Sequence, residues 1–294
     1  MLDKIFNYIS YYQWWKNLDK FILGLIITLF LIGLFFSLVS TSLIASDKLD
    51  TNSYFFFFKH LIFVIIGIGL IFIFSYIDQE ILYKISIYIF FVSLILLFLV
   101  PIIGVEVKGS KRWLDIFFLP RLQPIELVKP FFIIVLSTLI TFDKLKNFTL
   151  KFILTLFLTL LIAFFLIIQP DLGQTLLVGF TWMILIFISG VNLVFLLTIS
   201  VLGLSLLLYF TFYVPKFEYI KNRILSFFNS ETGTHNFQSD KATDSIISGG
   251  FFGKGIGEGT LKNRVPEAHT DYIVSVISEE FGVIVIILIL ILFL

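Results

Sequence analysis

Apolar residues fill most of the chain in long unbroken runs that short polar connections separate. Eight such runs cover residues 21–45, 61–77, 85–105, 125–142, 152–168, 172–189, 191–214 and 272–294. A helix needs about 20 apolar residues to cross the hydrocarbon core of a bilayer. None of the runs alternates between apolar and polar positions, as the strands of a membrane barrel would. The pattern predicts an all-α polytopic membrane protein, a bundle of about eight transmembrane helices.

Most connections between the runs are tight, which predicts antiparallel neighbouring helices. The two long connections are residues 106–121 and 215–271. If eight spans are counted, both lie on the same side of the membrane, and the second is one large loop within a single transmembrane domain, residues 1–294. An amphipathic segment with Tyr, Trp and Lys residues, 5–15, precedes the first run and suits a membrane interface.

Composition agrees with this class and excludes several functions. Hydrophobic residues make up 59% of the chain and charged residues 14%, more apolar surface than a soluble core of this size buries. The net charge of +1 argues against a nucleic-acid partner. The absence of cysteine excludes disulfides, iron–sulfur clusters and thiolate catalysis, and three scattered histidines do not make a zinc site.

The longest polar stretch, residues 234–282, holds the candidate chemistry, because membrane anchoring does not require its three main features. These are a glycine run (Gly249, Gly250, Gly253, Gly255, Gly257, Gly259), the cluster Pro266-Glu267-Ala268-His269-Thr270-Asp271, and the acidic pair Glu279-Glu280. No strand precedes the glycines and Lys254 is not followed by Ser or Thr, so a nucleotide-binding loop is rejected. The glycines instead predict tight backbone packing, against a sugar or against the helix bundle. Thr270 is a good N-cap for the last helix, with Asp271 in its first turn.

The connection at 106–121 carries three cations beside an interfacial aromatic: Lys108, Lys111, Arg112 and Trp113. Such a cluster suits an anionic group such as a pyrophosphate, with Arg112 offering a planar fork of donors. The alternative is a basic loop that touches lipid phosphates.

Two further polar motifs stand at the ends of apolar runs. Glu126 and Lys129 lie three residues apart, close enough on one helical face to form an ion pair. An unpaired charge in hydrocarbon costs at least about 2.5 kcal/mol, so either this pairing or a water-filled cavity is expected. They either fix helix packing or line a polar substrate cavity. In Gln169-Pro170-Asp171, the aspartate is a candidate cap for the helix that follows.

Read together, these motifs resemble a known family. The polar stretch reads Q-x-x-x-A-x-x-x-I-x-S-G-G-x-x-G-x-G-x-G-x-G-T, then P-E-A-H-T-D-Y-I and E-E-F-G; the earlier elements read G-x-x-R-W, Q-P-I-E-x-x-K and Q-P-D-x-G. They resemble the SEDS family of peptidoglycan glycosyltransferases, the FtsW/RodA/SpoVE family. Ile125 departs from the pattern, since the family usually has Ser there. The segment 257–262 resembles the cell-division branch more than the elongation branch.

The resemblance implies an inverting polymerase of lipid II that releases undecaprenyl pyrophosphate, with Asp271 as the catalytic base. The substrate-binding residues that we expect are Lys108, Lys111, Arg112, Glu126, Lys129, Gln238, Glu267 and His269. We expect Asp271, Arg112 and Lys111 to face one cavity. The family fold has ten spans, so the chain resembles a fragment that lacks the last two.

The resemblance also implies partners, a cellular location and an orientation in the membrane. It implies a class B penicillin-binding transpeptidase and other division proteins as partners, and a place in the bacterial inner membrane at the septum. It places the N-terminus in the cytoplasm and both long connections outside, so that residues 215–271 are one large extracytoplasmic loop, although the distribution of Lys and Arg favours the opposite orientation. A divalent cation (Mg or Mn) is a possible cofactor, and no resident metal site is predicted. The alternatives are a lipid II flippase, a polytopic transporter and a division scaffold.

Overall fold

A computed structural model describes residues 11–41, 54–107, 110–115, 121–143, 145–218, 221–222, 224–225, 237–265, 268 and 272–294. The predictions for Lys108, Glu267, His269 and Asp271 therefore lie outside the described residues, and Gln238 is described by its backbone alone. The chain divides into two compact units. The first comprises residues 77–208, and the second the described residues before Ile77 and after Leu208. The prediction of a single domain stays a prediction, and each unit is described by itself.

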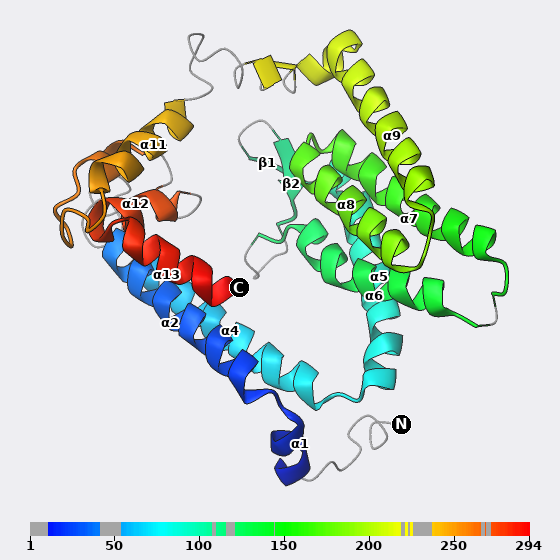
Figure 1. Ribbon diagram of the computed structural model, residues 1–294, viewed down its shortest axis with the longest axis horizontal. Coiled ribbons are helices and arrows are strands. Elements are labelled where there is room, and N and C mark those ends of the chain that lie inside the picture. The colour runs from blue at the N-terminus through cyan, green and yellow to red at the C-terminus, as the bar shows by residue number, and fades with distance from the viewer. Residues whose placement is uncertain are drawn as a thin grey trace. The chain divides into compact units, whose positions relative to one another are not determined.

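The first unit is a bundle of helices, seen side by side in Figure 1. It contains α5 (Gln79–Ile103), α6 (Pro124–Thr141), α7 (Phe148–Ile168), α8 (Leu172–Ile188) and the first part of α9 (Leu193–Tyr213). On α5 the buried residues are Ser86, Phe90, Ser93, Leu97 and Val100, spaced alternately four and three apart. This spacing gives a narrow stripe that faces the neighbouring helices, while the remaining apolar side chains face outward. Most of the outer surface is therefore apolar, as a lipid-facing bundle requires.

A small antiparallel hairpin joins α5 to α6, and the sequence reading did not predict it. Its strands are β1 (Val105–Val107) and β2 (Ser110–Trp113), with Val107 paired to Ser110. An isolated bridge between Leu114 and Leu122 continues the pairing. Leu114 is buried, so the hairpin is held against the bundle rather than extending freely from it.

The second unit contains the chain's first and last helices (Figure 1). They are α1 (Tyr11–Asn17), α2 (Lys20–Thr41), α4 (Phe55–Tyr76), η2 (Pro215–Phe217), α11 (Phe237–Gly249), η3 (Leu261–Arg264), α12 (Ile273–Phe281) and α13 (Val283–Phe293). The short α1 lies against the end of α4, where the indole of Trp14 donates a hydrogen bond to Ser75 Oγ at 3.2 Å. The long polar connection, residues 215–271, contains the helix α11.

Six described helices are long and apolar enough to cross a membrane, namely α2, α4, α5, α6, α7 and α9. The prediction of a continuous last span from Tyr272 to Leu294 is wrong. Its helix stops at Phe281 and restarts at Val283, with Gly282 between them at φ 82° and ψ 174°. That conformation suits glycine alone among common residues, and it leaves α13 with 11 residues.

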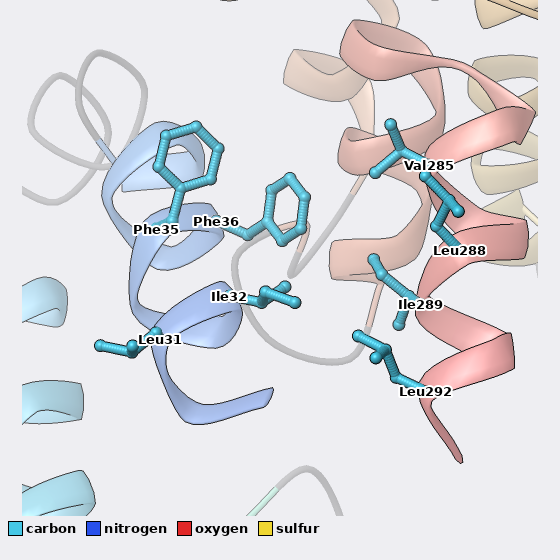
Figure 2. A pocket seen from close by; sticks show the side chains of 8 residues that line it. All are labelled: Leu31, Ile32, Phe35, Phe36, Val285, Leu288, Ile289 and Leu292. Carbon is cyan, nitrogen blue, oxygen red and sulfur yellow. The ribbon is translucent and has the colours of Figure 1, made fainter. Parts of the chain in front are cut away.

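An apolar groove of about 390 Å³ separates α13 from α2. Figure 2 shows Leu31, Ile32, Phe35 and Phe36 of α2 on one side, and Val285, Leu288, Ile289 and Leu292 of α13 on the other. Val285 lies on the level of Phe36 and Leu292 on the level of Leu31, so the two helices run in opposite directions. The beginning of α13 therefore lies beside the last part of α2.

Candidate functional site

The first group of candidate residues surrounds Arg112 on β2. Its guanidinium donates from Nε to the carbonyl oxygen of Gln169 at 3.2 Å, and from a terminal nitrogen to the carbonyl oxygen of Pro170. The other terminal nitrogen lies 3.6 Å from the Asp171 carboxylate. Three acceptors of one turn thus occupy the three nitrogens, which fixes the hairpin to the connection between α7 and α8.

Asp171 caps α8 as its sequence position predicted. Its carboxylate accepts a hydrogen bond from the backbone N–H of Gln174 at 3.4 Å and lies 3.5 Å from the side-chain amide of Gln123. The carboxylate is largely buried, so its charge is offset by Arg112, the helix N-terminus and the Gln123 amide together. Gln169 adds a second attachment, since its amide donates to the carbonyl oxygen of Leu97 on α5.

Glu126 and Lys129 form the predicted ion pair, with 2.7 Å between Glu126 Oε2 and Lys129 Nζ. Pro124 occupies the first turn of α6, where its missing N–H needs no helical partner. The other carboxylate oxygen, Glu126 Oε1, accepts a hydrogen bond from the side chain of Gln174 at 3.1 Å. Gln174 thereby links the pair to Asp171, and its own buried Oε1 has no hydrogen-bond partner among the described residues.

These contacts form one polar network, defined here as Arg112, Gln123, Glu126, Lys129, Asp171 and Gln174. The sequence reading named four of its members and missed Gln123 and Gln174. Gln174 stands three residues after the capping aspartate, in the first turn of α8. This spacing is the sequence signal by which it could have been found. Beside the network, exposed Lys111 lines a pocket of about 230 Å³ together with Glu106, Ser110, Gln169 and Pro170.

Ile125, which replaces the family's usual serine, is buried in the apolar core of the bundle. Its side chain points away from water, so the substitution removes a hydroxyl and adds packing surface at this position.

The second group of candidate residues lies in the other unit, around Glu279 on α12. The side chain of Glu279 is 0% exposed. One carboxylate oxygen accepts from Lys254 Nζ at 3.2 Å and from the backbone N–H of Leu261 at 2.9 Å, and the other accepts from Ser245 Oγ at 3.0 Å. A buried carboxylate is costly unless it is paired and hydrogen-bonded, and these three donors meet that requirement.

The glycine run forms the rest of the enclosure around Glu279 and Glu280. A Cβ on Gly249 would lie 1.9 Å from the carbonyl oxygen of Ser278, and one on Gly253 would lie 2.2 Å from that of Glu280. The backbone N–H of Gly257 donates to the Glu280 carboxylate at 3.1 Å. The predicted tight packing is found at Gly249, Gly253 and Gly259, which lie against α12, whereas a Cβ on Gly250 or Gly257 would meet nothing within 4 Å.

Both ends of the segment 266–271 are attached to this enclosure. Upstream, Leu261 begins η3 with its N–H on Glu279, and Val265 is buried. Downstream, α12 begins at Ile273 and itself carries Glu279. Thr270, the predicted cap of this helix, lies outside the described residues, and the described helix begins with Tyr272 in the N-cap position.

Arg112, Glu126 and Lys129 thus belong to one network, with Lys111 beside it. The expected cavity shared with Asp271 stays a prediction, as do the roles of Lys108, Gln238, Glu267 and His269. Among the described residues, no three His, Asp or Glu side chains gather closely enough to hold a metal ion. The divalent cation therefore also stays a prediction.

Comparison with known proteins places these motifs in a family. The profile described as "cell cycle protein", which covers FtsW, RodA and SpoVE, matches residues 19–294. The chain belongs to this family. A probable peptidoglycan glycosyltransferase FtsW from Caulobacter vibrioides is 30% identical over 275 residues, which cover 92% of this chain and 68% of the relative. One from Trichlorobacter lovleyi is 32% identical over 282 residues, covering 92% and 72%.

Two solved structures share the fold of this chain. A chain from a peptidoglycan synthase complex, studied for the coordination of polymerization and crosslinking, matches with a TM-score of 0.68 at 23% identity. The match covers 92% of this chain and 74% of that one. RodA from Thermus thermophilus matches with a TM-score of 0.57 at 22% identity, over 92% and 70% of the two chains. The chain is a multi-pass membrane protein with the fold of this family.

Proposed function

We propose that this protein is a peptidoglycan glycosyltransferase that polymerises lipid II into glycan strands during septal wall synthesis. The observation that carries the proposal is the match to the family over residues 19–294, within which P-E-A-H-T-D is retained at 266–271. Relatives named probable peptidoglycan glycosyltransferase FtsW support it. The enclosure of Glu279 supports it physically, because it holds both ends of the segment that carries Asp271.

The reaction needs a base on one side of the reacting carbon and a charge acceptor on the other. The 4-hydroxyl of the acceptor N-acetylglucosamine attacks C1 of the lipid-linked muramyl sugar. The new C–O bond forms as the bond to undecaprenyl pyrophosphate breaks, and the configuration at C1 inverts. Asp271 takes the hydroxyl proton, since a carboxylate with an ordinary pKa of about 4 is ionised at neutral pH.

In this proposal the cations near the hairpin stabilise the departing pyrophosphate. Arg112 is already bonded to three acceptors of the Gln169–Asp171 turn, so its part is to hold the hairpin in place. Lys111 is exposed and neighbours that turn in the small pocket, so it is the described cation of β2 that is available to a ligand. This division of roles refines the expectation that both residues bind the pyrophosphate alike.

The Glu126–Lys129 pair contributes a polar, partly exposed surface at the beginning of α6. The side chain of Glu126 is 51% exposed, and Gln174 holds its second oxygen. The pair is therefore fixed in position yet open to a substrate. We assign the pair to substrate positioning rather than to packing alone.

Two finer proposals follow from family membership. The partner that crosslinks the new strands is a class B penicillin-binding transpeptidase, alongside other division proteins, since this chain contains no Ser-x-x-Lys motif of its own. The location is the bacterial inner membrane at the septum. The main rival function is a lipid II flippase, which would use the same substrate and basic residues but would not need a proton acceptor.

The deciding experiment compares Asp271→Asn with Asp240→Asn, an exposed aspartate on α11. Each purified protein is incubated with lipid II, and glycan chains are resolved on a gel. Asn at 271 keeps the shape but accepts no proton, so polymerisation falls by at least about a hundredfold, while Asp240→Asn behaves as wild type. Normal polymerisation by Asp271→Asn excludes the base. Normal lipid II translocation in liposomes without any polymerisation by the wild type favours the flippase.

A further inference from the structure

Four large apolar side chains at the end of α11 and in the glycine run face outward. The exposed fractions are 72% for Ile247, 74% for Phe251, 83% for Phe252 and 64% for Ile256. We call them the apolar rim. They lie in a connection between two spans that is otherwise polar, and none of them packs into the enclosure around Glu279. Neither the fold of the second unit nor the proposed reaction accounts for their exposure.

The depth of α12 in the membrane follows from its contact with α2. The ring of Phe281, the last residue of α12, lies 5.3 Å from that of Phe36 and 5.9 Å from that of Phe35. The candidate membrane span of α2 runs from Lys20 to Val39. Phe36 lies within this span. Phe281 therefore lies beside a part of α2 that is apolar enough to be in the membrane.

The apolar rim lies on the same level as Phe281. The backbone N–H of Val283 donates to the carbonyl oxygen of Gly250 at 3.0 Å, and that of Ile284 lies 3.4 Å from the carbonyl oxygen of Phe251. These bonds attach the rim to the first turn of α13. Since α13 continues beside α2 toward the other end of the span, as Figure 2 shows, the rim lies where the span has already begun.

Along its length, α11 changes from polar to apolar, as expected if its end lies on the level of the α2 span. Its first eight residues include the exposed Asp240 and Asp244, and its last turn carries Ile247. Ser245 contacts Glu279, and the carbonyl oxygen of Gly250 contacts Val283, so α11 and α12 run in the same direction. The polar half is therefore on the water side and the apolar end on the membrane side.

Irregular backbone is tolerated at membrane depth only where its polar groups are paired within the protein. The glycine run meets this condition. The N–H of Gly253 donates to Gly249, that of Lys254 to Glu279 and that of Gly255 to Glu280, all to backbone oxygens within 3.0 Å. The ammonium of Lys254 lies on the Glu279 carboxylate, so the one cation of this turn is neutralised.

We propose that α11 and the glycine run form a re-entrant element whose apolar rim inserts between the acyl chains of the lipid bilayer. The occupant of the exposed surface is lipid hydrocarbon. Three independent features support it: the level of the rim beside the α2 span, the polar-to-apolar change along α11, and the pairing of the Gly253, Lys254 and Gly255 amides with backbone oxygens. The insertion holds the enclosure around Glu279, and with it the ends of segment 266–271, at the membrane surface.

The test uses the absence of cysteine from the chain. Single cysteines replace Phe252 in the rim, Glu258 on the returning part of the glycine run, and Val201 in the middle of α9. Each protein is spin-labelled and placed in phospholipid nanodiscs, and collisions with oxygen and with a water-soluble nickel chelate are measured. All three side chains are exposed, so the substitutions leave the packing intact.

The expected ratio of oxygen to nickel collisions at position 252 exceeds that at position 258 roughly tenfold, because oxygen concentrates in hydrocarbon while the chelate stays in water. Position 201, on a candidate span, gives the reference for lipid contact. A ratio at 252 equal to that at 258 overturns the proposal, since the rim is then in water. Protection of 252 from both reagents also overturns it, because another protein then covers the rim. Ile247→Cys repeats the test on α11 and must agree.

Discussion

The polar network of the first unit and the enclosure around Glu279 in the second both pair carboxylates with a cation, yet they are built differently. In the network the charged side chains meet one another at the ends of helices, and Glu126 remains half-exposed. In the enclosure the carboxylate is fully buried, and one side-chain hydroxyl, one ammonium and one backbone amide surround it. The first arrangement leaves charge available to a ligand, whereas the second uses its charge to join segments distant in sequence.

This difference predicts how each region responds to substitution. Changes in the enclosure act mainly on stability, because they leave buried polar groups without partners. Changes at the partly exposed Glu126–Lys129 pair of the network act mainly on substrate binding, because water replaces the lost partner. The predictions below run from the largest expected effect to the smallest, and each uses a matched residue as its control.

The largest effect is expected for Gly253→Ala in the enclosure. The residue has φ 76°, and a Cβ would lie 2.2 Å from the carbonyl oxygen of Glu280. Strain and displaced backbone together cost about 4 kcal/mol of unfolding free energy. The control is Gly179→Ala in α8, where nothing lies within 4 Å and Ala is the better helix former. Thermal unfolding in detergent, followed by circular dichroism, should separate the two variants; equal melting temperatures would contradict the packing described for the glycine run.

Glu279→Ala should cost about 3 kcal/mol of unfolding free energy. The change leaves the Ser245 hydroxyl and the Leu261 amide without their acceptor in a buried place, and it removes the partner of Lys254. Glu258→Ala, on an exposed glutamate of the same segment, should change stability by less than about 0.5 kcal/mol. Chemical denaturation of both variants measures the difference. A neutral Glu279→Ala would mean that the enclosure does not depend on its carboxylate.

Arg112→Lys should lower the unfolding free energy by about 1.5 kcal/mol, because an ammonium cannot reach the three acceptors that the guanidinium fork binds. Lys111→Gln, at the neighbouring exposed position, should leave stability unchanged. Under the proposed function it should instead raise the KM for lipid II roughly tenfold, through loss of a contact to the pyrophosphate. If Arg112→Lys keeps full stability while Lys111→Gln loses it, the roles assigned to the two cations are reversed.

The smallest effect on stability is expected for Lys129→Met. The pair with Glu126 is partly exposed, so its loss should cost less than about 1 kcal/mol. Polymerisation should fall far more than stability does, because the side chain positions substrate in the proposed function. Parallel loss of melting temperature and of activity would instead assign the pair to helix packing.

The sequence predicts the helices of the first unit closely, because unbroken apolar runs of this length have few alternatives in a membrane. The predicted run 125–142 became α6 from Pro124 to Thr141, and 172–189 became α8 from Leu172 to Ile188. The capping role of Asp171 and the Glu126–Lys129 pair depend on neighbours three residues apart, a spacing that can be read directly.

The remaining features depend on contacts that spacing does not encode. Lys254 and Ser245 reach Glu279 across irregular backbone, and Arg112 bonds to carbonyl oxygens that any residue would supply. The hairpin left a signal, since two residues, the second a glycine, separate the paired Val107 and Ser110. The break at Gly282 left one too: a glycine directly after Glu279, Glu280 and Phe281 is a common helix end.

The break at Gly282 also places two carboxylates directly before the apolar run that begins at Val283. During synthesis, residues 273–294 emerge with these carboxylates in their first half, each opposing partition into lipid by on the order of 2.5 kcal/mol. The partners of the carboxylates, Ser245, Lys254 and the amides of the glycine run, precede them in the chain and are made first. The neutralising groups are therefore synthesised before the two carboxylates. In a circular permutant with α11 placed after α13, the carboxylates would meet lipid before their partners are made.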